Sequence, residues 1–417
     1  MKAAILLIIS LFTTVVYAQQ NVNYDESKVP VYTLPKLLEG SKGEKISTTE
    51  QWEKQRRPEL LELFTSQVYG RTPTGKIDVT YETMVENPNA MGGKATGKQV
   101  KFTFSNGKKK IEALLLIYIP NNITGKVPVF IGYNFKGNHS TTSDITVLYS
   151  PTLQLIKGPD HHDRERGTQK SRWNYDKIID RGYAVATMCY HDIFPDSPEL
   201  KEYSILSLFP GYGPEVTVPD EWQAIGAWAW GSSRIVDFLE TEEKIDGDKI
   251  AIMGHSRQGK AALWAGAQDE RFKIVISNNS GCGGAALFRR KFGETIAVIN
   301  KNFPHWFCNN FLQYNDRDEE LPTDQHQLIA LMAPRKVYVA SAENDLWADP
   351  RGEFLSAYHA GKVYQLYGLK AIDSDEMPKI HQPIMEDIGY HIRAGEHDVM
   401  DYDWECYLNF ADKHFRN

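Results

Sequence analysis

Short apolar runs rich in β-branched residues recur along this chain and alternate with segments of helical periodicity. Such runs fit strands buried on both faces, and their alternation with helices is typical of a mostly parallel sheet covered on both sides. We therefore predict an α/β fold, a three-layer α/β/α sandwich. The expected strands are 111–119, 127–133, 184–189, 250–254, 274–277, 337–341 and 389–392. The expected helices are 221–241, 259–267, 325–332 and 404–415.

The chain has 417 residues, yet we expect residues 19–417 to form a single domain. Proteins of this class often exceed the usual domain size without splitting, and the sequence contains no internal repeat or low-complexity linker. Residues from about 19 to 100 are more polar and are expected to be an N-terminal extension packed on the main domain. Within it, 51–69 has helical character and 87–97 is polar and glycine-rich.

The N-terminus combines a basic Lys2, an apolar run from Ala3 to Val16 and the small-residue pattern that ends at Ala18. This arrangement predicts a signal peptide, residues 1–18, with cleavage after Ala18. The run is short of the roughly 20 apolar residues that cross a bilayer, so a membrane-spanning helix is the less favoured interpretation. We expect a secreted or periplasmic protein without membrane insertion.

The formal net charge is −7 and becomes −8 once Lys2 is removed with the signal peptide. An acidic chain lacks the basic surface that nucleic-acid binding requires, so we expect no nucleic-acid partner. The four cysteines, at 189, 282, 308 and 406, show no C-x-x-C spacing that would indicate zinc or redox chemistry. Export permits a disulfide but the spacing does not identify its pair. We expect no metal and no organic cofactor.

The strongest local motif runs from Lys249 to Ala262 and reads KIAIMGHSRQGKAA. An apolar strand leads into Gly254-x-Ser256, and a helix of small residues leaves from Gly259. This places the serine at a tight turn from strand to helix, where its hydroxyl would be exposed at a helix N-terminus, as in the nucleophile turn of α/β-hydrolases. The second glycine is three residues after the serine instead of two, so the pattern G-x-S-x-G itself is absent.

A nucleophilic serine needs a general base and an acid, which in this fold follow it in the order Ser, Asp or Glu, His. The loop after strand 337–341 carries Glu343, Asp345 and Asp349, and His397 lies in the loop after strand 389–392. Ligands bind outside the carboxyl ends of strands in open α/β sheets, which is where these loops are expected. The spacing does not show which of these three residues is the catalytic acid.

Two groups could stabilise the oxyanion that forms during acyl transfer. The fold usually supplies a backbone donor from the loop that here is Asn134–His139. Arg257, next to Ser256, is the stronger candidate, because a fixed guanidinium offers several donors to a developing negative charge.

Several motifs over roughly residues 100–417 resemble those of the glucuronoyl esterases, carbohydrate esterase family 15. Gly254-His-Ser-Arg-Gln-Gly-Lys260 is similar to the family pattern G-[CH]-S-R-x-G-K. The other matching segments are Arg181–Thr187, Ser280–Ala285, Phe303–Cys308, Leu321–His326 and Ala333–Arg335.

The resemblance assigns a role to individual residues. It implies that Ser256 is the nucleophile, His397 the base and Arg257 the oxyanion partner. It also implies that Lys260 reaches the sugar hydroxyls. Glu294 and Trp347 match positions that line the uronate pocket of bacterial members.

The resemblance breaks down at the catalytic acid of fungal members. They carry it on the strand after the nucleophile helix, where this chain has Asn279. An amide cannot stabilise an imidazolium by charge. Some bacterial members use an aspartate after the next-to-last strand, the place of Asp345, so we predict Asp345 as the acid, with Glu343 and Asp349 as alternatives.

The resemblance implies a serine esterase that cleaves the ester between 4-O-methyl-glucuronic acid on glucuronoxylan and lignin alcohols. We also expect the protein to be a monomer. A xylan acetyl esterase or another carboxylesterase is the alternative within enzymes, since a triad does not define the acyl group. A non-catalytic carbohydrate-binding relative is the alternative outside them, and Asn279 is the reason to consider it.

Overall fold

The computed structural model describes residues 22–158, 164–211, 213 and 218–416 of the chain. The predicted signal peptide, 1–18, lies outside them. One ten-stranded sheet organises the fold. Its strands are β1 (Asp78–Ala90), β2 (Ala95–Ser105), β3 (Lys110–Pro120), β4 (Val127–Asn134), β5 (Ala184–Cys189), β6 (Ile245–His255), β7 (Phe272–Asn278), β8 (Lys336–Ala342), β9 (Ile384–Met385) and β10 (Ile388–Arg393).

The strand order in the sheet is β1-β2-β3-β5-β4-β6-β7-β8-β10-β9. From β5 to β10 every pair of neighbours is parallel. The strands β1, β2 and β3 at one edge and β9 at the other are antiparallel to their neighbours. The six parallel strands therefore share one carboxyl edge.

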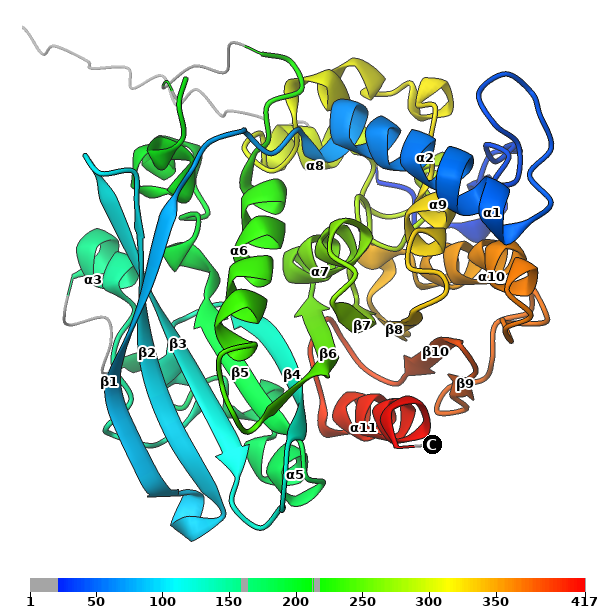
Figure 1. The fold of residues 1–417 in the computed structure, drawn as a ribbon. Coiled ribbons are helices and arrows are strands. Elements are labelled where there is room, and N and C mark those ends of the chain that lie inside the picture. The colour runs from blue at the N-terminus through cyan, green and yellow to red at the C-terminus, as the bar shows by residue number, and fades with distance from the viewer. Residues whose placement is uncertain (1–21, 159–163, 212, 214–217, 417) are drawn as a thin grey trace, which may run out of the picture.

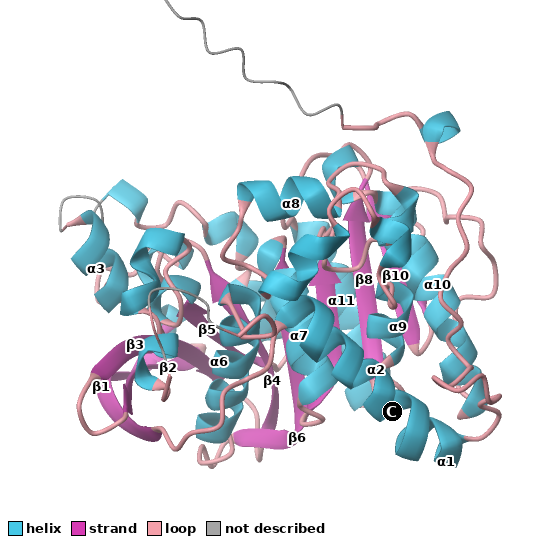
Figure 2. Ribbon diagram, turned by 90° about the horizontal axis from the view of Figure 1, so that it is seen from above, coloured by secondary structure: helices cyan, strands magenta, loops and turns pink. Residues whose placement is uncertain are grey.

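Helices cover both faces of this sheet (Figures 1 and 2). They are α1 (Thr49–Gln51), α2 (Arg57–Phe64), α3 (Pro151–Lys157), α5 (Tyr175–Asp180), α6 (Ala224–Leu239), α7 (Arg257–Gln268), α8 (Ile296–Asn302), α9 (Gln325–Ala330), α10 (Pro350–Leu366) and α11 (Asp401–Phe415). The core on one face includes side chains of α2, α6, α7, α9 and α10, and that on the other includes those of α5 and α11. The predicted α/β/α sandwich is confirmed.

The N-terminal extension differs from the expectation. We expected a segment packed on the main domain, whereas β1 and β2 pair along 78–105 and continue the central sheet through β3. Most side chains of β1 are exposed or only partly buried. An edge strand with so little apolar burial lacks the apolar pattern that identifies a strand in a sequence.

All four cysteines are buried and none forms a disulfide. Among the described residues no helix is both long and apolar enough to cross a membrane.

Candidate active site

Ser256 occupies the turn between β6 and α7, with φ of 57° and ψ of −129°. This positive φ is uncommon for a residue other than glycine and marks a strained position. The turn requires Gly254, because a Cβ there would lie 1.9 Å from the carbonyl oxygen of Gln258. It also requires Gly259, whose Cβ would lie 2.8 Å from that of Ser280. The sequence thus fixes the serine at the carboxyl edge of the sheet.

His397 reaches the site from the loop between β10 and α11. Its Nδ1 lies 2.6 Å from Oδ2 of Asp345, which follows β8. A carboxylate can only accept, so Nδ1 carries the proton and Nε2 is left to act as an acceptor. The side chain of Asp345 is 4% exposed and that of His397 is 39% exposed. A buried acid therefore orients a base that solvent and substrate can reach.

Asn279 is a second hydrogen-bond partner of Asp345. Its Nδ2 donates to the same Oδ2 at 3.0 Å, from a left-handed backbone conformation with φ of 47°. Asn279 therefore helps to hold the carboxylate of Asp345 in place beside His397. Glu343 is partly exposed, and Asp349 bonds to Arg290 at 2.9 Å and caps α10.

These groups line one cavity of about 290 Å³ at the carboxyl edge. It brings together all seven side chains proposed for the site: Ser256, Arg257, Lys260, Glu294, Asp345, Trp347 and His397. Asn279, Phe303 and Trp306 also line it, whereas no residue of the loop 134–139 does. Of the two oxyanion candidates, only Arg257 faces this cavity.

Arg257 lies against two aromatic rings. Its guanidinium carbon is 4.7 Å from the ring centre of Trp306 and 5.4 Å from that of Phe303. These two rings are stacked with centres 3.7 Å apart. Cation–π contacts of this kind restrict the guanidinium to one plane.

Asp196 fixes the other end of the guanidinium, and nothing in the sequence pointed to it. It accepts a hydrogen bond from Nη1 of Arg257, and further bonds from His305 and Trp306, each at 2.8 Å, and from the Tyr190 hydroxyl at 3.0 Å. Burial alone would raise the pKa of Asp196, but the bond from His305 and the charge of Arg257 lower it well below its usual range. The carboxylate therefore stays charged.

Lys260 and Glu294 form a buried pair, with each side chain 4% exposed and 3.5 Å between Nζ and Oε2. Nζ also donates to the carbonyl oxygens of Ser280 and Cys282, each at 2.6 Å. Burial raises the pKa of Glu294, and Lys260 opposes that rise. Trp347 is 37% exposed at the cavity and its carbonyl accepts the backbone N–H of Glu294 at 3.0 Å.

The donor set does not suit a metal. In the described ranges no group of three or more His, Cys, Asp or Glu side chains could hold a metal ion. What the cavity offers is a serine, an imidazole paired with a carboxylate and a fixed guanidinium, the groups used in acyl transfer.

Comparison with known proteins decides the family. A family model described as "Glucuronyl esterase, fungi" matches residues 219–368. A carbohydrate esterase named MZ0003, from an unknown prokaryotic organism, is 44% identical over 408 residues, covering 96% of this chain and 94% of that relative. The solved glucuronoyl esterase from Solibacter usitatus is 43% identical with a TM-score of 0.87, covering 93% of this chain and 99% of the other.

A second solved structure is that of a promiscuous esterase of carbohydrate esterase family 15 from the marine bacterial metagenome. It is 43% identical with a TM-score of 0.85, covering 94% of this chain and 100% of the other. The chain belongs to carbohydrate esterase family 15. It is therefore a carboxylic ester hydrolase with the α/β-hydrolase fold, and the predicted resemblance is confirmed.

Proposed function

We propose that this family 15 member is a glucuronoyl esterase that hydrolyses the ester between 4-O-methyl-glucuronic acid side chains of glucuronoxylan and lignin alcohols. The observation that carries the proposal is that one cavity holds the strained Ser256 and the pair of His397 and Asp345 together with the buried pair of Lys260 and Glu294. The predicted signal peptide supports a secreted or periplasmic activity.

In the first step Oγ of Ser256 attacks the ester carbonyl while Nε2 of His397 takes the hydroxyl proton. The tetrahedral intermediate collapses as His397 returns that proton to the leaving alcohol, which gives a glucuronoyl-enzyme. Water then attacks the acyl group by the same proton route and releases the uronate. Asp345, which accepts from Nδ1, stabilises the imidazolium in both steps.

The cations of the site act on charge that appears during the reaction. The ester masks the uronate carboxylate, so the substrate is neutral at that group, and the intermediate is anionic. Arg257 is held by Asp196 and by the Trp306 ring, so its remaining N–H groups are positioned before the charge develops. Donors fixed in this way lower the barrier instead of only improving binding.

Recognition of the sugar is assigned to Lys260, Glu294 and Trp347. Lys260 directs two of its three protons to carbonyl oxygens and pairs with Glu294 at 3.5 Å, so it holds the Glu294 carboxylate in place at the cavity. Glu294 beside it can accept from a hydroxyl, and Trp347 offers an apolar ring. An acetyl group has no hydroxyls for such a constellation to bind.

The experiment compares methyl glucuronate, with and without the 4-O-methyl group, with methyl galacturonate and an acetylated sugar on the purified protein. We expect kcat/KM to be highest for the glucuronates, and turnover to vanish in Ser256→Ala. Equal or faster turnover of the acetylated sugar would reject the glucuronoyl assignment in favour of an acetyl or general carboxylesterase. Binding of glucuronates without any turnover would favour a non-catalytic relative.

A further inference from the structure

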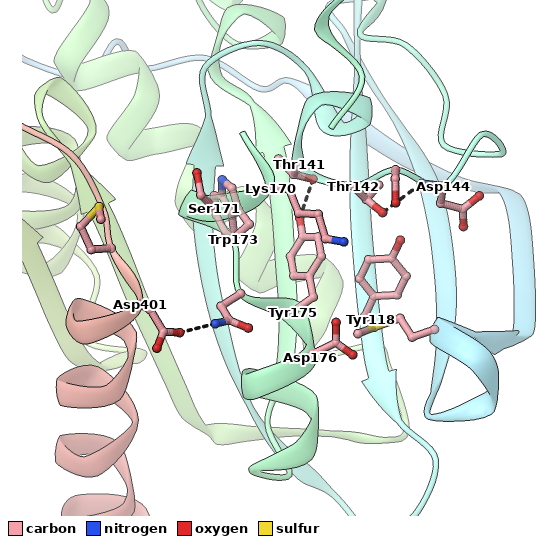
Figure 3. Close-up of a pocket in the computed structure, with 14 residues that line it drawn as sticks. Tyr118, Thr141, Thr142, Asp144, Lys170, Ser171, Trp173, Tyr175, Asp176 and Asp401 are labelled. Carbon is pink, nitrogen blue, oxygen red and sulfur yellow. Dashed lines mark hydrogen bonds between the residues drawn. The ribbon is translucent and has the colours of Figure 1, made fainter. Parts of the chain in front are cut away.

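Figure 3 shows a second cavity, of about 720 Å³, and none of its lining residues lines the cavity around Ser256. It is more than twice the volume of the candidate active site and lies within the range of ligand-binding sites. We name it the Trp173 groove. Its lining comes from the segments 141–144 and 170–176, from Met91 and Tyr118 beside β1 and β3, and from the start of α11.

The Trp173 groove and the active site lie on two sides of one loop. His397 lines the active site, and Met400 and Asp401 line the groove. Four residue steps span at most about 15 Å, so the two cavities are neighbours. The loop is tied down where they meet, because Arg172 forms an ion pair with Asp398 and its carbonyl accepts from Nε1 of Trp404 at 2.9 Å. A single extended ligand could therefore occupy both cavities.

Three packed aromatic rings form the floor of the groove. The ring centres of Tyr118 and Tyr175 are 5.0 Å apart, and those of Trp173 and Tyr175 are 6.1 Å apart. The hydroxyl of Tyr175 donates to Oγ1 of Thr141 at 2.7 Å, as Figure 3 shows. All three residues are at most 7% exposed, so the floor is preformed and rigid.

The rim of the groove is rich in hydrogen-bond acceptors. Asp144, Asp176 and Asp401 contribute carboxylates, against the single cation Lys170 among the lining residues. The side chains of Asp176 and Asp401 are 64% and 67% exposed, so their oxygens can accept from a ligand as well as from Lys94 and Lys177. This balance disfavours an anion and suits a neutral molecule with many hydroxyl groups.

We propose that the Trp173 groove is an accessory subsite that binds the neutral sugar main chain of the substrate while the uronate branch occupies the active site. The linings of the two cavities differ, because in the active site Arg257 and Lys260 stand beside two carboxylates, Asp345 and Glu294, whereas the groove has three carboxylates and one lysine. The role as a subsite rests on the proposed function, whereas the affinity of the groove for neutral sugars is independent of that function.

The experiment fills the groove without touching the active site. Ser143 and Ser171 are exposed at its rim, so Ser143→Trp and Ser171→Trp add bulk with little effect on packing. Ser374→Trp is the matched control, because Ser374 is exposed on a loop that lines neither cavity. Each full-length variant is tested for binding of a linear xylo-oligosaccharide by calorimetry. Each is also tested for kcat/KM on methyl glucuronate and on the same ester carried by a xylo-oligosaccharide.

We expect the wild type and Ser374→Trp to bind the xylo-oligosaccharide, and both groove variants to bind it at least about tenfold more weakly. Their kcat/KM should fall by a similar factor on the oligosaccharide ester and stay unchanged on methyl glucuronate. The proposal is overturned if the wild type does not bind the neutral oligosaccharide, if it binds an aromatic alcohol there instead, or if both groove variants behave as the wild type. Oligosaccharide binding without turnover of any ester would support the groove as a sugar-binding site and reject the proposed function.

Discussion

Asp345 and His397 come from loops 52 residues apart and meet with 2.6 Å between Oδ2 and Nδ1. The same oxygen accepts from Asn279 at 3.0 Å, so this aspartate is held from two sides before any substrate arrives. Asn279, which the resemblance places at the position of the fungal acid, here donates to Asp345, the acid that we propose. On this proposal the departure at Asn279 still leaves His397 with a carboxylate partner.

The first prediction concerns the acid. Asp345→Asn should lower kcat on methyl glucuronate by about ten-thousandfold, because an amide favours the wrong tautomer of His397 and cannot stabilise its protonated form. Steady-state kinetics measure the loss. Circular dichroism and a thermal melt establish that the variant is folded.

The two other acids in this loop are the controls. Glu343→Gln should keep near-wild-type activity, since the Glu343 side chain lines no part of the active site. Asp349→Asn should lower the melting temperature, because Asp349 pairs with Arg290 and caps α10, but its kcat should fall far less than that of Asp345→Asn. A ten-thousandfold loss in either control, with Asp345→Asn active, would identify the residue changed in that control as the catalytic acid.

A second prediction concerns the guanidinium. Arg257→Ala should lower kcat by about a hundredfold to a thousandfold with a smaller change in KM, as expected for a donor that acts on the developing oxyanion. Arg257→Lys should recover only part of the rate, because an ammonium lacks the planar fork that Asp196 and Trp306 hold. A loss confined to KM would assign Arg257 to ground-state binding instead.

Asp196 provides the third prediction, as a positioning residue that acts through Arg257. Asp196→Asn should lower kcat in the wild-type background and have little further effect in Arg257→Ala, because both changes remove the same positioned donor. The double-mutant cycle on kcat separates this from a general structural effect. Additive losses in the cycle would show that Asp196 does not act through Arg257.

The buried pair of Lys260 and Glu294 gives a fourth prediction. Lys260→Met should destabilise the fold by about 3 kcal/mol, because it leaves a buried carboxylate and two carbonyl oxygens without their donor. The double variant Lys260→Met/Glu294→Gln should regain stability, since no buried charge is left unpaired, yet remain slow on glucuronates. Denaturant unfolding tests the predicted changes in stability, and kcat/KM tests the predicted loss of activity on glucuronates. Full activity of the double variant would show that Lys260 and Glu294 do not recognise the sugar.

How far the sequence predicts this molecule depends on how much each segment is buried. All seven expected strands are present, because buried strands consist of continuous apolar residues. β1 was missed, since most of its side chains are at least partly exposed and its sequence alternates weakly. β2 was missed as well, although several of its side chains are buried.

Some active-site residues can be identified from a sequence motif, whereas others can be identified only from the fold. Ser256 and His397 lie at strand ends with recognisable neighbours, and Gly254 marks the turn, so order along the chain was enough to predict that both line one cavity. Asp196 lies in a loop after β5 with no motif around it. Three of its four donors, Arg257, His305 and Trp306, are distant in sequence, and only the fold brings them to Asp196.

The pH dependence of stability supplies the fifth prediction, through the buried His326 of α9. Burial lowers the pKa of His326 to about 3, against an ordinary value of 6.5. Between those two pH values the unfolded chain binds a proton at this residue and the folded protein does not, so stability falls as the pH drops. His326→Gln should therefore reduce the slope of unfolding free energy against pH by up to about 1.4 kcal/mol per unit between pH 6 and 4.

Urea unfolding of both proteins at several pH values measures this slope, and above pH 7 the two slopes should coincide because His326 is neutral in both states. An unchanged slope between pH 6 and 4 would show that His326 takes up a proton in the folded protein.

Hydrolysis of methyl glucuronate by the wild type and by Ser256→Ala tests the central assignment most directly. The account predicts that kcat falls by on the order of a millionfold while the melting temperature stays within a few degrees, and that mass spectrometry finds a glucuronoyl adduct only on wild-type Ser256. A folded Ser256→Ala protein that hydrolyses methyl glucuronate at a wild-type rate would contradict it.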